Sequence, residues 1–525
     1  MFVNLIFILT FSIQNIYANE PATVHTQYGD ILGYQTNLAR IFYGIPFAQP
    51  PVGTLRWQSP VPITKWDPKV INATQPPPAC AQAESTITSI RTPVLMSEDC
   101  LYLNIFTPLC NTSTSTNLLP VMIFIHGGSF RSGSASESIF ESEHFVNTTN
   151  TIIVLIQYRL GVLGFFATGN GPNDIKGNYG ILDQRLAIAW IKANLNAFGG
   201  DPNEITLFGQ SAGAQSTALH YMTSEMQSFF KRAIIQSAPM TVPFRTYLDY
   251  VAPGVLLAEQ LHCTPNDISC FQSRTTNEII AAQNIVNNML TSLNILNFFE
   301  PWVPVIDNMI IHGQILDIVR NISFPLKPLI IGTVTEECYN FVYETWNKTV
   351  SPSEYIGVII VLFREKASKV LQQYPPEGSG DQRFLIVRFA THWVFSCSTR
   401  VFARKAASYN YVYGYPSNKD NLKKNSIQCT DHACHADELP FLFESYWNNF
   451  TDTGRYISQS MATYWTNFAK SQDPNDPLKV PVSWPRVTSG NETYMYIQDP
   501  LQIGTNYLKS DCDVWDEIGY KEFSF

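Results

Sequence analysis

The sequence predicts an α/β fold, in which parallel strands alternate with helices. Three short runs are apolar throughout and rich in β-branched residues, as strands buried on both faces require: 121–125 (VMIFI), 152–156 (IIVLI) and 205–208 (ITLF). Between the last two, apolar residues recur at helical spacing from Leu182 to Ala197, and a Gly-Gly-Asp-Pro stretch ends the run. Strand, helix and strand in this order form a parallel crossover.

Later segments continue the alternation. Residues 328–333 (PLIIGT) and 411–415 (YVYGY) are expected to be strands, and residues 458–471 are expected to be a helix. Length alone, at 525 residues, would allow about three domains. No repeat or long linker divides the chain, however, and the candidate catalytic residues extend from residue 126 to residue 435. We therefore expect a single domain over residues 19–525.

The composition excludes two classes of protein. Hydrophobic residues make up 45% of the chain and charged residues 15%, which is typical of a chain with a large packed core and not of a disordered one. The net charge is −9 and no basic run occurs, so we expect no nucleic-acid partner.

The first residues indicate export. Residues 1–18 are apolar, uncharged and too short to span a bilayer, as in a secretory signal peptide cleaved after Ala18; the alternative is a buried N-terminal strand. Ten cysteines remain after cleavage, an even number that suits an oxidising compartment. We expect no membrane anchor, and a protein that is secreted or held in the lumen of a secretory or vesicular compartment. Seven N-x-S/T sequons are candidate glycosylation sites: Asn72, Asn111, Asn147, Asn321, Asn347, Asn449 and Asn491.

The strongest chemical motif is the sequence GQSAG at residues 209–213. It follows the strand ITLF directly, and the residues after Gly213 can continue as a helix. A sharp turn between strand and helix exposes the serine hydroxyl above the sheet, and the glycines allow neighbouring backbone to approach closely. We interpret Ser211 as a nucleophile, against the alternative of a glycine-rich turn that contains a serine by chance.

A second motif, FIHGGSFRSG at residues 124–133, follows the strand VMIFI. Acyl transfer requires hydrogen-bond donors for a tetrahedral oxyanion, and an HGG run after an early strand supplies them in some hydrolases. We expect the oxyanion hole to consist of the backbone N–H groups of Gly128, Ser129 and Ala212. His126 would then shape the loop and not act as a base.

Together with these motifs, much of the chain resembles the type-B carboxylesterase/lipase family, which includes the cholinesterases. The similar stretches include YGIPFAQPPVGTLRW, SEDCLYLNIFTP, YRLGVLGFF, GNYGILDQRLAIAWIKANLNAFGGDPNEITLFGQSAG, CHADELPFLF and YWTNFAKSQDPN. The resemblance implies the α/β-hydrolase fold, with a large, mostly parallel central sheet flanked by helices. It also implies an acyl-serine mechanism with a triad in the chain order Ser, acid, His.

The base and the acid of the triad follow from the resemblance. Six histidines lie after Ser211 and spacing alone does not choose among them, but His435 stands where the family has its base, with His432 as the rival. The acid corresponds to Glu337, with Glu336 as the alternative. The family usually has a glycine after this glutamate, and here the residue is Cys338.

The cysteines fit the same family. The resemblance implies disulfides Cys80–Cys100, Cys263–Cys270 and Cys397–Cys512, with Cys429–Cys434 closing a loop before His435, and it leaves the state of Cys110 and Cys338 open. The cluster of Cys429, His432, Cys434 and His435 is dense enough to consider zinc, but the export signals favour a disulfide, and we expect no metal and no cofactor. Buried ion pairs Arg56–Glu98 and Arg159–Asp183 are also implied.

Two departures from the cholinesterases bear on the substrate. Residues 81–99 contain no aromatic side chain that could stack on a quaternary ammonium, and Gln210 replaces the glutamate that usually precedes the nucleophile. We therefore expect a small-molecule ester without choline. Phe298, Phe299 and Trp302 would favour apolar acyl groups, whereas Glu300 has no role assigned from the sequence. The alternatives are a lipase of the same fold and a non-catalytic adhesion or storage protein.

Overall fold

A single large sheet organises the molecule. The computed structural model describes residues 20–66, 69–83, 95–109, 118–265, 267–293, 300–420, 422, 429–488 and 490–520. Thirteen strands within these residues form one sheet. They are β1 (Glu20–Thr26), β2 (Gly29–Gln35), β3 (Ala39–Pro46), β4 (Val70–Asn72), β7 (Tyr102–Pro108), β8 (Leu119–Ile125), β9 (Ile152–Ile156), β10 (Gly200–Gln210), β11 (Arg232–Gln236), β12 (Leu329–Val334), β13 (Tyr409–Tyr413), β14 (Thr493–Ile497) and β15 (Gln502–Thr505).

The middle of this sheet is parallel and its two edges are antiparallel. The spatial order is β1-β2-β3-β7-β9-β8-β10-β11-β12-β13-β14-β15, with β4 beside β2. Every pair from β9 to β14 is parallel, whereas the pairs that join β1, β2, β3, β7 and β9 in sequence, and the pair β14–β15, are antiparallel; the short strand β4 pairs parallel with β2. The crossover expected between residues 152 and 208 is present: β9 and β10 lie on either side of β8, parallel to it.

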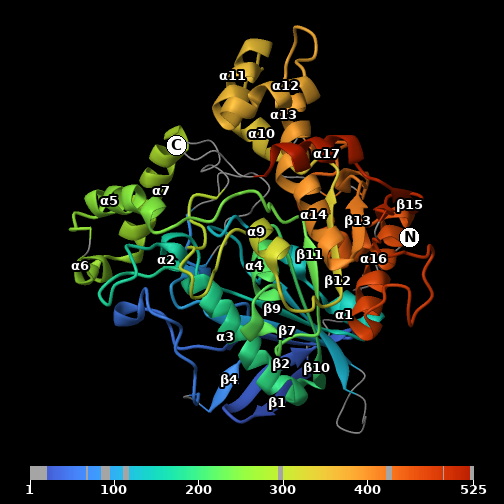
Figure 1. The fold of residues 1–525 in the computed structure, drawn as a ribbon. Helices are drawn as coiled ribbons and strands as arrows, with labels where there is room; N and C mark the ends of the chain where they lie inside the picture. The colour runs from blue at the N-terminus through green and yellow to red at the C-terminus, as the bar shows by residue number, and fades with distance from the viewer. Residues whose placement is uncertain are drawn as a thin grey trace, which may run out of the picture.

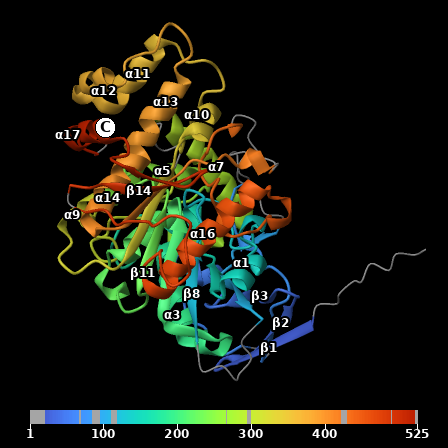
Figure 2. The same cartoon turned by 90° about the vertical axis from the view of Figure 1, so that its right-hand side faces the viewer.

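Helices cover both faces of the sheet. The helices of the first half are α1 (Glu143–Thr149), α2 (Gly161–Phe165), α3 (Tyr179–Asn194), α4 (Ala212–Tyr221), α5 (Val251–Gln260), α6 (Ile268–Ser273) and α7 (Thr276–Leu293). Those of the second half are α9 (Ile315–Asn321), α10 (Tyr339–Thr345), α11 (Pro352–Phe363), α12 (Ala367–Gln373), α13 (Arg383–Ala390), α14 (Cys397–Ala406), α15 (Leu439–Leu442), α16 (Asp452–Ser471) and α17 (Lys509–Ile518). Figure 2 shows α3 on one side of the sheet and α1 and α16 on the other.

Two hydrophobic cores lie on the two faces of the sheet. Along β8, Val121, Ile123 and Ile125 belong to the core under α3 and α4, whereas Met122 and Phe124 belong to the core under α1 and α16. Side chains of a strand alternate between faces, so a strand covered on both sides is apolar at every position. This explains the unbroken apolar runs in the sequence.

The expected helix at residues 458–471 is longer than its apolar pattern. Helix α16 begins at Asp452, because the side chain of Thr451 accepts a hydrogen bond from the backbone N–H of Gly454 and caps the first turn (3.1 Å). Helix α3 ends at Asn194, and a short 3₁₀ turn leads to Gly199, whose φ of 83° lies in the left-handed region.

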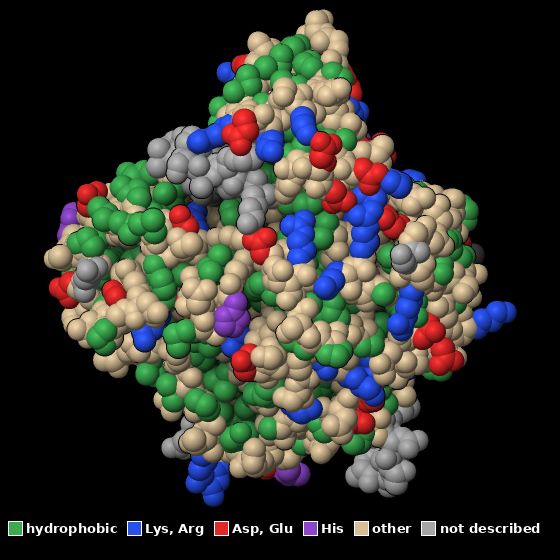
Figure 3. All heavy atoms as spheres, in the orientation of Figure 1, with side chains coloured by type: hydrophobic (Ala, Val, Ile, Leu, Met, Phe, Trp, Pro, Cys, Tyr) green, Lys and Arg blue, Asp and Glu red, His purple; other side chains and the backbone are tan. Residues whose placement is uncertain are grey.

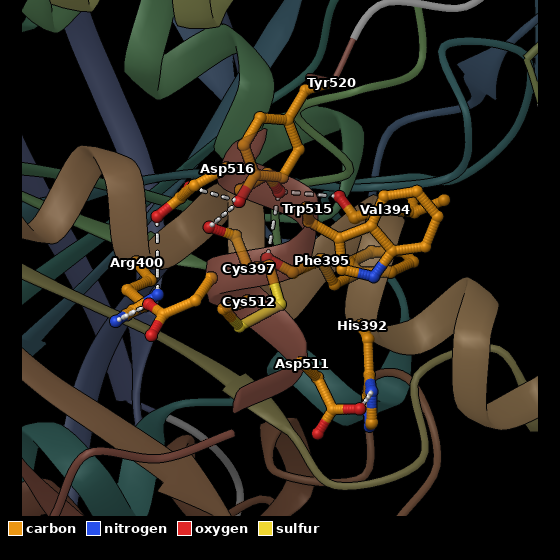
Figure 4. Close-up of a disulfide and its surroundings, with 12 residues drawn as sticks. His392, Val394, Phe395, Cys397, Arg400, Asp511, Cys512, Trp515, Asp516 and Tyr520 are labelled. Atoms are coloured by element: carbon orange, nitrogen blue, oxygen red, sulfur yellow. Dashed lines mark hydrogen bonds and ion pairs between the residues drawn. A yellow bond between two sulfur atoms is a disulfide. The ribbon is translucent and has the colours of Figure 1, made fainter. Parts of the chain in front are cut away.

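A helical cap covers one end of the sheet. Helices α11, α12 and α13 project from the body beyond the carboxyl ends of the parallel strands, with α10 beneath them (Figure 1). The disulfide Cys397–Cys512 joins α14 to α17 next to this cap (Figure 4). Tyr520 strengthens the junction, because its hydroxyl lies within hydrogen-bond distance of the carbonyl of Cys397 (3.2 Å) and of Asp516 (2.7 Å).

The cysteines pair as the resemblance implies. The structure contains the disulfides Cys80–Cys100, Cys263–Cys270, Cys397–Cys512 and Cys429–Cys434. Cys338 is free and buried, and Cys110 lies outside the described residues.

Two buried ion pairs confirm expected architectural contacts. Arg56 Nη2 lies 2.6 Å from Glu98 Oε1, and Arg159 Nη2 lies 2.7 Å from Asp183 Oδ1. In both pairs the guanidinium Nε donates to the second carboxylate oxygen, so each carboxylate is bound at two points.

The surface carries the expected sequons. Six sequon asparagines are exposed, while Asn111 lies outside the described residues; the six are Asn72, Asn147, Asn321, Asn347, Asn449 and Asn491.

Figure 3 shows charged side chains gathered near α14 and α17, and apolar ones over α5 and α7. Among the described helices, none is long and apolar enough to cross a membrane.

Candidate active site

Ser211 occupies the turn between β10 and α4. Its backbone lies at φ 58° and ψ −127°, a strained conformation for a residue with a side chain. Its N–H donates to the carbonyl of Gln236 on β11 (3.0 Å), and its own carbonyl accepts from the N–H groups of Ala214 and Gln215 at 2.8 and 2.9 Å. These three hydrogen bonds hold the strained residue in place.

The glycines of the motif are required by space. A Cβ atom on Gly209 would lie 2.3 Å from the carbonyl oxygen of Gly213. A Cβ atom on Gly213 would lie 2.0 Å from the carbonyl oxygen of Ile125, at the end of β8. The first turn of α4 therefore packs directly on the backbone of two strands, which only glycine permits.

The loop after β8 brings backbone N–H groups towards the same point. Gly128 has φ 107°, and a Cβ atom there would lie 2.1 Å from the carbonyl oxygen of Ser132. Ser129 has φ 54° and lines the same cavity as Ser211. Within the described residues, the N–H groups of Gly128, Ser129 and Ala212 donate to no protein acceptor. Three free donors near one hydroxyl can bind an oxyanion.

His126 belongs to the framework of this loop. Burial lowers the pKa of His126 to about 4, so its imidazole is neutral at neutral pH. Its Nδ1 lies 2.8 Å from the carbonyl oxygen of Gly127, and its ring stacks on Tyr158 with centroids 4.6 Å apart. These contacts fit the expectation that His126 shapes the loop.

Glu337 and His435 contact each other through their side chains. Glu337 follows β12 and is fully buried. One of its oxygens accepts from the backbone N–H of Val334 (2.9 Å), and the other lies 2.5 Å from Nδ1 of His435. The neighbouring Glu336 turns away and accepts from the backbone N–H of Ala433 (3.2 Å). Of the two adjacent acids, the structure therefore brings Glu337 to the imidazole.

The other ring nitrogen of His435 faces Gln210. An ionised carboxylate only accepts hydrogen bonds, so Nδ1 carries the proton in the neutral ring and Nε2 accepts. The side-chain nitrogen of Gln210 lies 3.1 Å from Nε2. In this structure the imidazole thus bonds the residue before Ser211, and no hydrogen bond joins it to the Ser211 hydroxyl among the described contacts. Catalytic hydrogen bonds are often longer without substrate.

The rival residues have other partners. The ring of His432 stacks on Tyr339, with centroids 4.3 Å apart. Cys429 and Cys434 are joined in a disulfide, so they present no thiolate for the zinc cluster considered from the sequence.

The sequence assigned no role to a second buried acid, Glu438, which lies close enough to Glu337 to feel its charge. Glu438, three residues after His435, accepts from the side chain of Gln236 on β11 (3.2 Å). Burial, together with the nearby charge of Glu337, raises the pKa of Glu438 to about 8. A protonated carboxyl at this position adds no second negative charge beside Glu337. The only available signal was the acid in the stretch HADE.

A cavity of about 680 Å³, open to solvent, lies beside Ser211. Its walls come from α10, α11, α13 and the π-helical turn Thr391–Ser396 (η7), and most of the lining is apolar. The exceptions are Ser129, Ser211, Glu300 and Cys338.

The residues expected to form the acyl pocket are not those that line the cavity in the structure. Trp302 is not part of the cavity wall: its Nε1 donates to Asn287 (2.7 Å) and its ring stacks on Tyr250 in the core, with centroids 6.0 Å apart. Phe298 and Phe299 lie outside the described residues. An apolar residue such as Trp302 can line a cavity or pack into the hydrophobic core. Its residue type alone therefore did not show which of these two locations it would take.

Comparison with known proteins agrees with this geometry. The profile of the carboxylesterase family matches residues 20–515. The chain belongs to the carboxylesterase family. The cAMP-regulated D2 protein of Dictyostelium discoideum is 33% identical over 511 residues, covering 96% of this chain and 94% of that protein. Acetylcholinesterase of Bungarus fasciatus is 31% identical over 535 residues, covering 94% of this chain and 86% of that enzyme.

A solved structure, a PNB esterase, superposes with a TM-score of 0.80 at 25% identity, covering 95% of this chain and all of that one. The mostly parallel sheet with helices on both faces is thus the α/β-hydrolase fold expected for a member of the carboxylesterase family. Residues 84–94, which make up most of the stretch without aromatic side chains, lie outside the described residues.

Proposed function

We propose that this member of the carboxylesterase family is a secreted serine esterase that hydrolyses carboxylic esters other than choline esters through an acyl-serine intermediate. The contact between Glu337 and His435 carries the proposal, because it leaves Nε2 as a proton acceptor beside the Ser211 turn. A buried acid, an imidazole and a serine on a strained turn form an arrangement suited to nucleophilic catalysis.

The mechanism assigns one task to each group. Ser211 attacks the ester carbonyl while His435 takes the hydroxyl proton, and the N–H groups of Gly128, Ser129 and Ala212 stabilise the oxyanion. His435 then delivers the proton to the leaving alkoxide. Water repeats the cycle on the acyl-enzyme. Glu337 keeps the proton on Nδ1 and stabilises the imidazolium that forms.

The preference against choline esters rests on charge. Gln210 is buried beside His435 and carries no charge, so it offers a quaternary ammonium no electrostatic attraction.

Export is supported by independent features. Four disulfides form in the described residues, which is typical of proteins from oxidising compartments. Six sequon asparagines are exposed and therefore accessible for glycosylation. Expression in a eukaryotic host should place the protein in the medium, with an endoglycosidase lowering its apparent mass; full retention in the cytosol would contradict this part of the proposal.

The decisive experiment measures hydrolysis and labelling together. The pure protein should hydrolyse p-nitrophenyl acetate and butyrate, and an organophosphate should abolish the activity and label Ser211. Ser211→Ala should lose both activity and label while it remains folded. Ser353→Ala, which alters an exposed serine on α11, should retain both. No hydrolysis and no label in the parent protein would overturn the esterase proposal and favour a non-catalytic role.

A lipase of the same fold is the second candidate. Five apolar side chains on α5, α7 and the turn before α5 are substantially exposed: Leu248, Val251, Val255, Ile285 and Met289. Exposed apolar side chains of this kind occur where proteins meet lipid surfaces. A rise in activity above the solubility limit of p-nitrophenyl butyrate would favour the lipase.

A further inference from the structure

One carboxyl group in the cavity has no place in the mechanism. Glu300 is the only charged residue that lines the cavity beside Ser211 within the described part of the chain. Its side chain is only 4% exposed. Acids are almost never buried in this way unless they are paired, so its partners decide what it does.

Those partners satisfy Glu300 poorly. The side-chain NH2 of Gln215, on α4, has two N–H groups: it donates to Oε2 of Glu300 at 3.2 Å and to the carbonyl of Pro239 at 3.1 Å, so Glu300 receives one donor from it. Oε1 of Glu300 has no hydrogen bond among the described contacts. Arg131, on the oxyanion loop, acts on Glu300 through its charge but forms no ion pair with it within 4 Å.

Carboxylates that support the fold are bound differently in this molecule. Glu98 and Asp183 are each held at both oxygens by one guanidinium. A buried acid with a full set of hydrogen-bond partners is interpreted as a structural residue. Glu300 has one amide donor and lines an open cavity, and a group with so few partners is suited to a ligand that completes its hydrogen bonds.

The position of Glu300 relative to His435 identifies the part of the ester that it meets. His435 must protonate the leaving alkoxide, so the alcohol of the ester lies on the His435 side of Ser211. Phe341 and Phe395 line the cavity, and both rings contact His435, with centroids 5.4 and 5.3 Å apart. His435 itself does not line the cavity, so we assign the cavity to the acyl group.

We propose that Glu300 is a specificity-determining residue that binds a hydroxyl group on the acyl chain of the ester. This inference rests on the proposed esterase function. A purely alkyl acyl chain would remove water from Glu300 without replacing its hydrogen bonds, whereas a hydroxyl can both accept a hydrogen bond from the carboxyl and donate one to it.

The electrostatics favour a neutral donor over a cation. Burial raises the pKa of Glu300 to about 8, so at neutral pH the carboxyl is mostly protonated and both donates and accepts. Arg131 already places positive charge nearby, which opposes an ammonium group in the same apolar space. A hydroxyl matches a protonated carboxyl and carries no charge to desolvate.

The test compares kcat/KM for p-nitrophenyl 3-hydroxybutanoate with that for p-nitrophenyl 3-methylbutanoate, in which a methyl group replaces the hydroxyl. The parent protein, Glu300→Leu and Glu300→Gln are measured. We expect Glu300→Leu to lower the hydroxy-to-methyl ratio by about 10- to 100-fold, as for the loss of one buried hydrogen bond. Glu300→Gln, which can still accept a hydrogen bond, should keep part of the preference.

Controls separate the outcomes. Each variant is labelled with an organophosphate at Ser211, and labelling shows that its site is folded. Glu365 is an exposed acid next to α11, so Glu365→Gln should leave the hydroxy-to-methyl ratio of kcat/KM unchanged. An equal ratio in the parent and in labelled Glu300→Leu overturns the inference while the esterase proposal stands. A stronger preference for the 3-aminobutanoate ester overturns the hydroxyl assignment. No hydrolysis of any ester and no label overturns the esterase proposal and this inference with it.

Discussion

The side-chain nitrogen of Gln210 lies 3.1 Å from Nε2 of His435, the ring nitrogen that takes the proton of Ser211 in the proposed mechanism. On its other side, Gln210 packs so closely on the oxyanion loop that a Cβ atom on Gly127 would lie 2.9 Å from its Oε1. Gln210 therefore connects the loop, the serine turn and the base, and a charge introduced at this position would act directly on the imidazole.

We expect Gln210→Glu to change the pH dependence of the enzyme. A carboxylate within hydrogen-bond distance of Nε2 would stabilise the protonated imidazolium, which is inactive as a base. The protonated form would then persist to higher pH, so the acid limb of kcat/KM for p-nitrophenyl butyrate should move up by about one pH unit.

A neutral substitution at the same position is the matched control. Gln210→Met keeps the length of the side chain without a charge, so it should leave the acid limb within a few tenths of its original pH even if it lowers kcat. Equal displacement of the limb in both variants would show that charge is not the cause.

The adjacent acids Glu336 and Glu337 offer a second test. Glu337→Gln should lower kcat by about three to four orders of magnitude, because the amide no longer holds the proton on Nδ1 of His435. Glu336→Gln should lower it by less than about tenfold, since Glu336 accepts only from backbone N–H of Ala433 and from Thr335. Similar losses in the two variants would contradict the assignment of Glu337 as the acid.

Local pattern was sufficient for five of the central strands (β8, β9, β10, β12 and β13) and for the serine turn, but it did not predict β11, whose apolar run is short and lies between Arg232 and Gln236. Strands such as β8 are covered on both faces, so every residue from 121 to 125 is apolar. The antiparallel edge strands were not predicted, because strands near the edge such as β1 and β2 alternate buried with exposed or partly exposed residues and resemble many loops.

The partners of Ser211 could not be found from local pattern. Glu337 and His435 are 98 residues apart, and Gln210 and His435 are 225 apart, so only the tertiary fold brings them together. The family resemblance supplied the identities of the base and the acid, but not the contact of Gln210. For a related reason, no role for Glu300 could be predicted from the sequence. An acid in a loop is usually solvated, and the burial of Glu300 depends on segments that are far away in the sequence.

Gly213, two residues after Ser211, should not tolerate replacement by any residue with a side chain. Gly213→Ala places a methyl group 2.0 Å from the carbonyl oxygen of Ile125, which cannot move without disturbing β8. We expect a loss of about 3 kcal/mol or more in the free energy of unfolding, as for overpacking in a core, together with loss of esterase activity.

The comparison variant is Gly357→Ala in the exposed middle of α11, where a Cβ atom would meet nothing within 4 Å. It should stabilise the protein by about 0.5–1 kcal/mol, because alanine favours a helix more than glycine does. Thermal and denaturant unfolding of both variants would measure the difference. A stable, active Gly213→Ala protein would contradict the close packing of α4 on β8.

The disulfide Cys397–Cys512 should contribute more to stability than Cys263–Cys270. The first joins residues 115 positions apart and the second joins residues 7 apart. Loop entropy in the unfolded chain then predicts that the free energy of unfolding falls by about 5 and about 2 kcal/mol, respectively, when each cysteine pair is replaced by serine.

Val394 and Phe395 precede Cys397 and line the cavity, so removal of the Cys397–Cys512 disulfide should also raise KM for p-nitrophenyl butyrate (Figure 4). Denaturant unfolding and steady-state kinetics test both effects, and equal losses from the two pairs would show that the loop length does not determine their contribution.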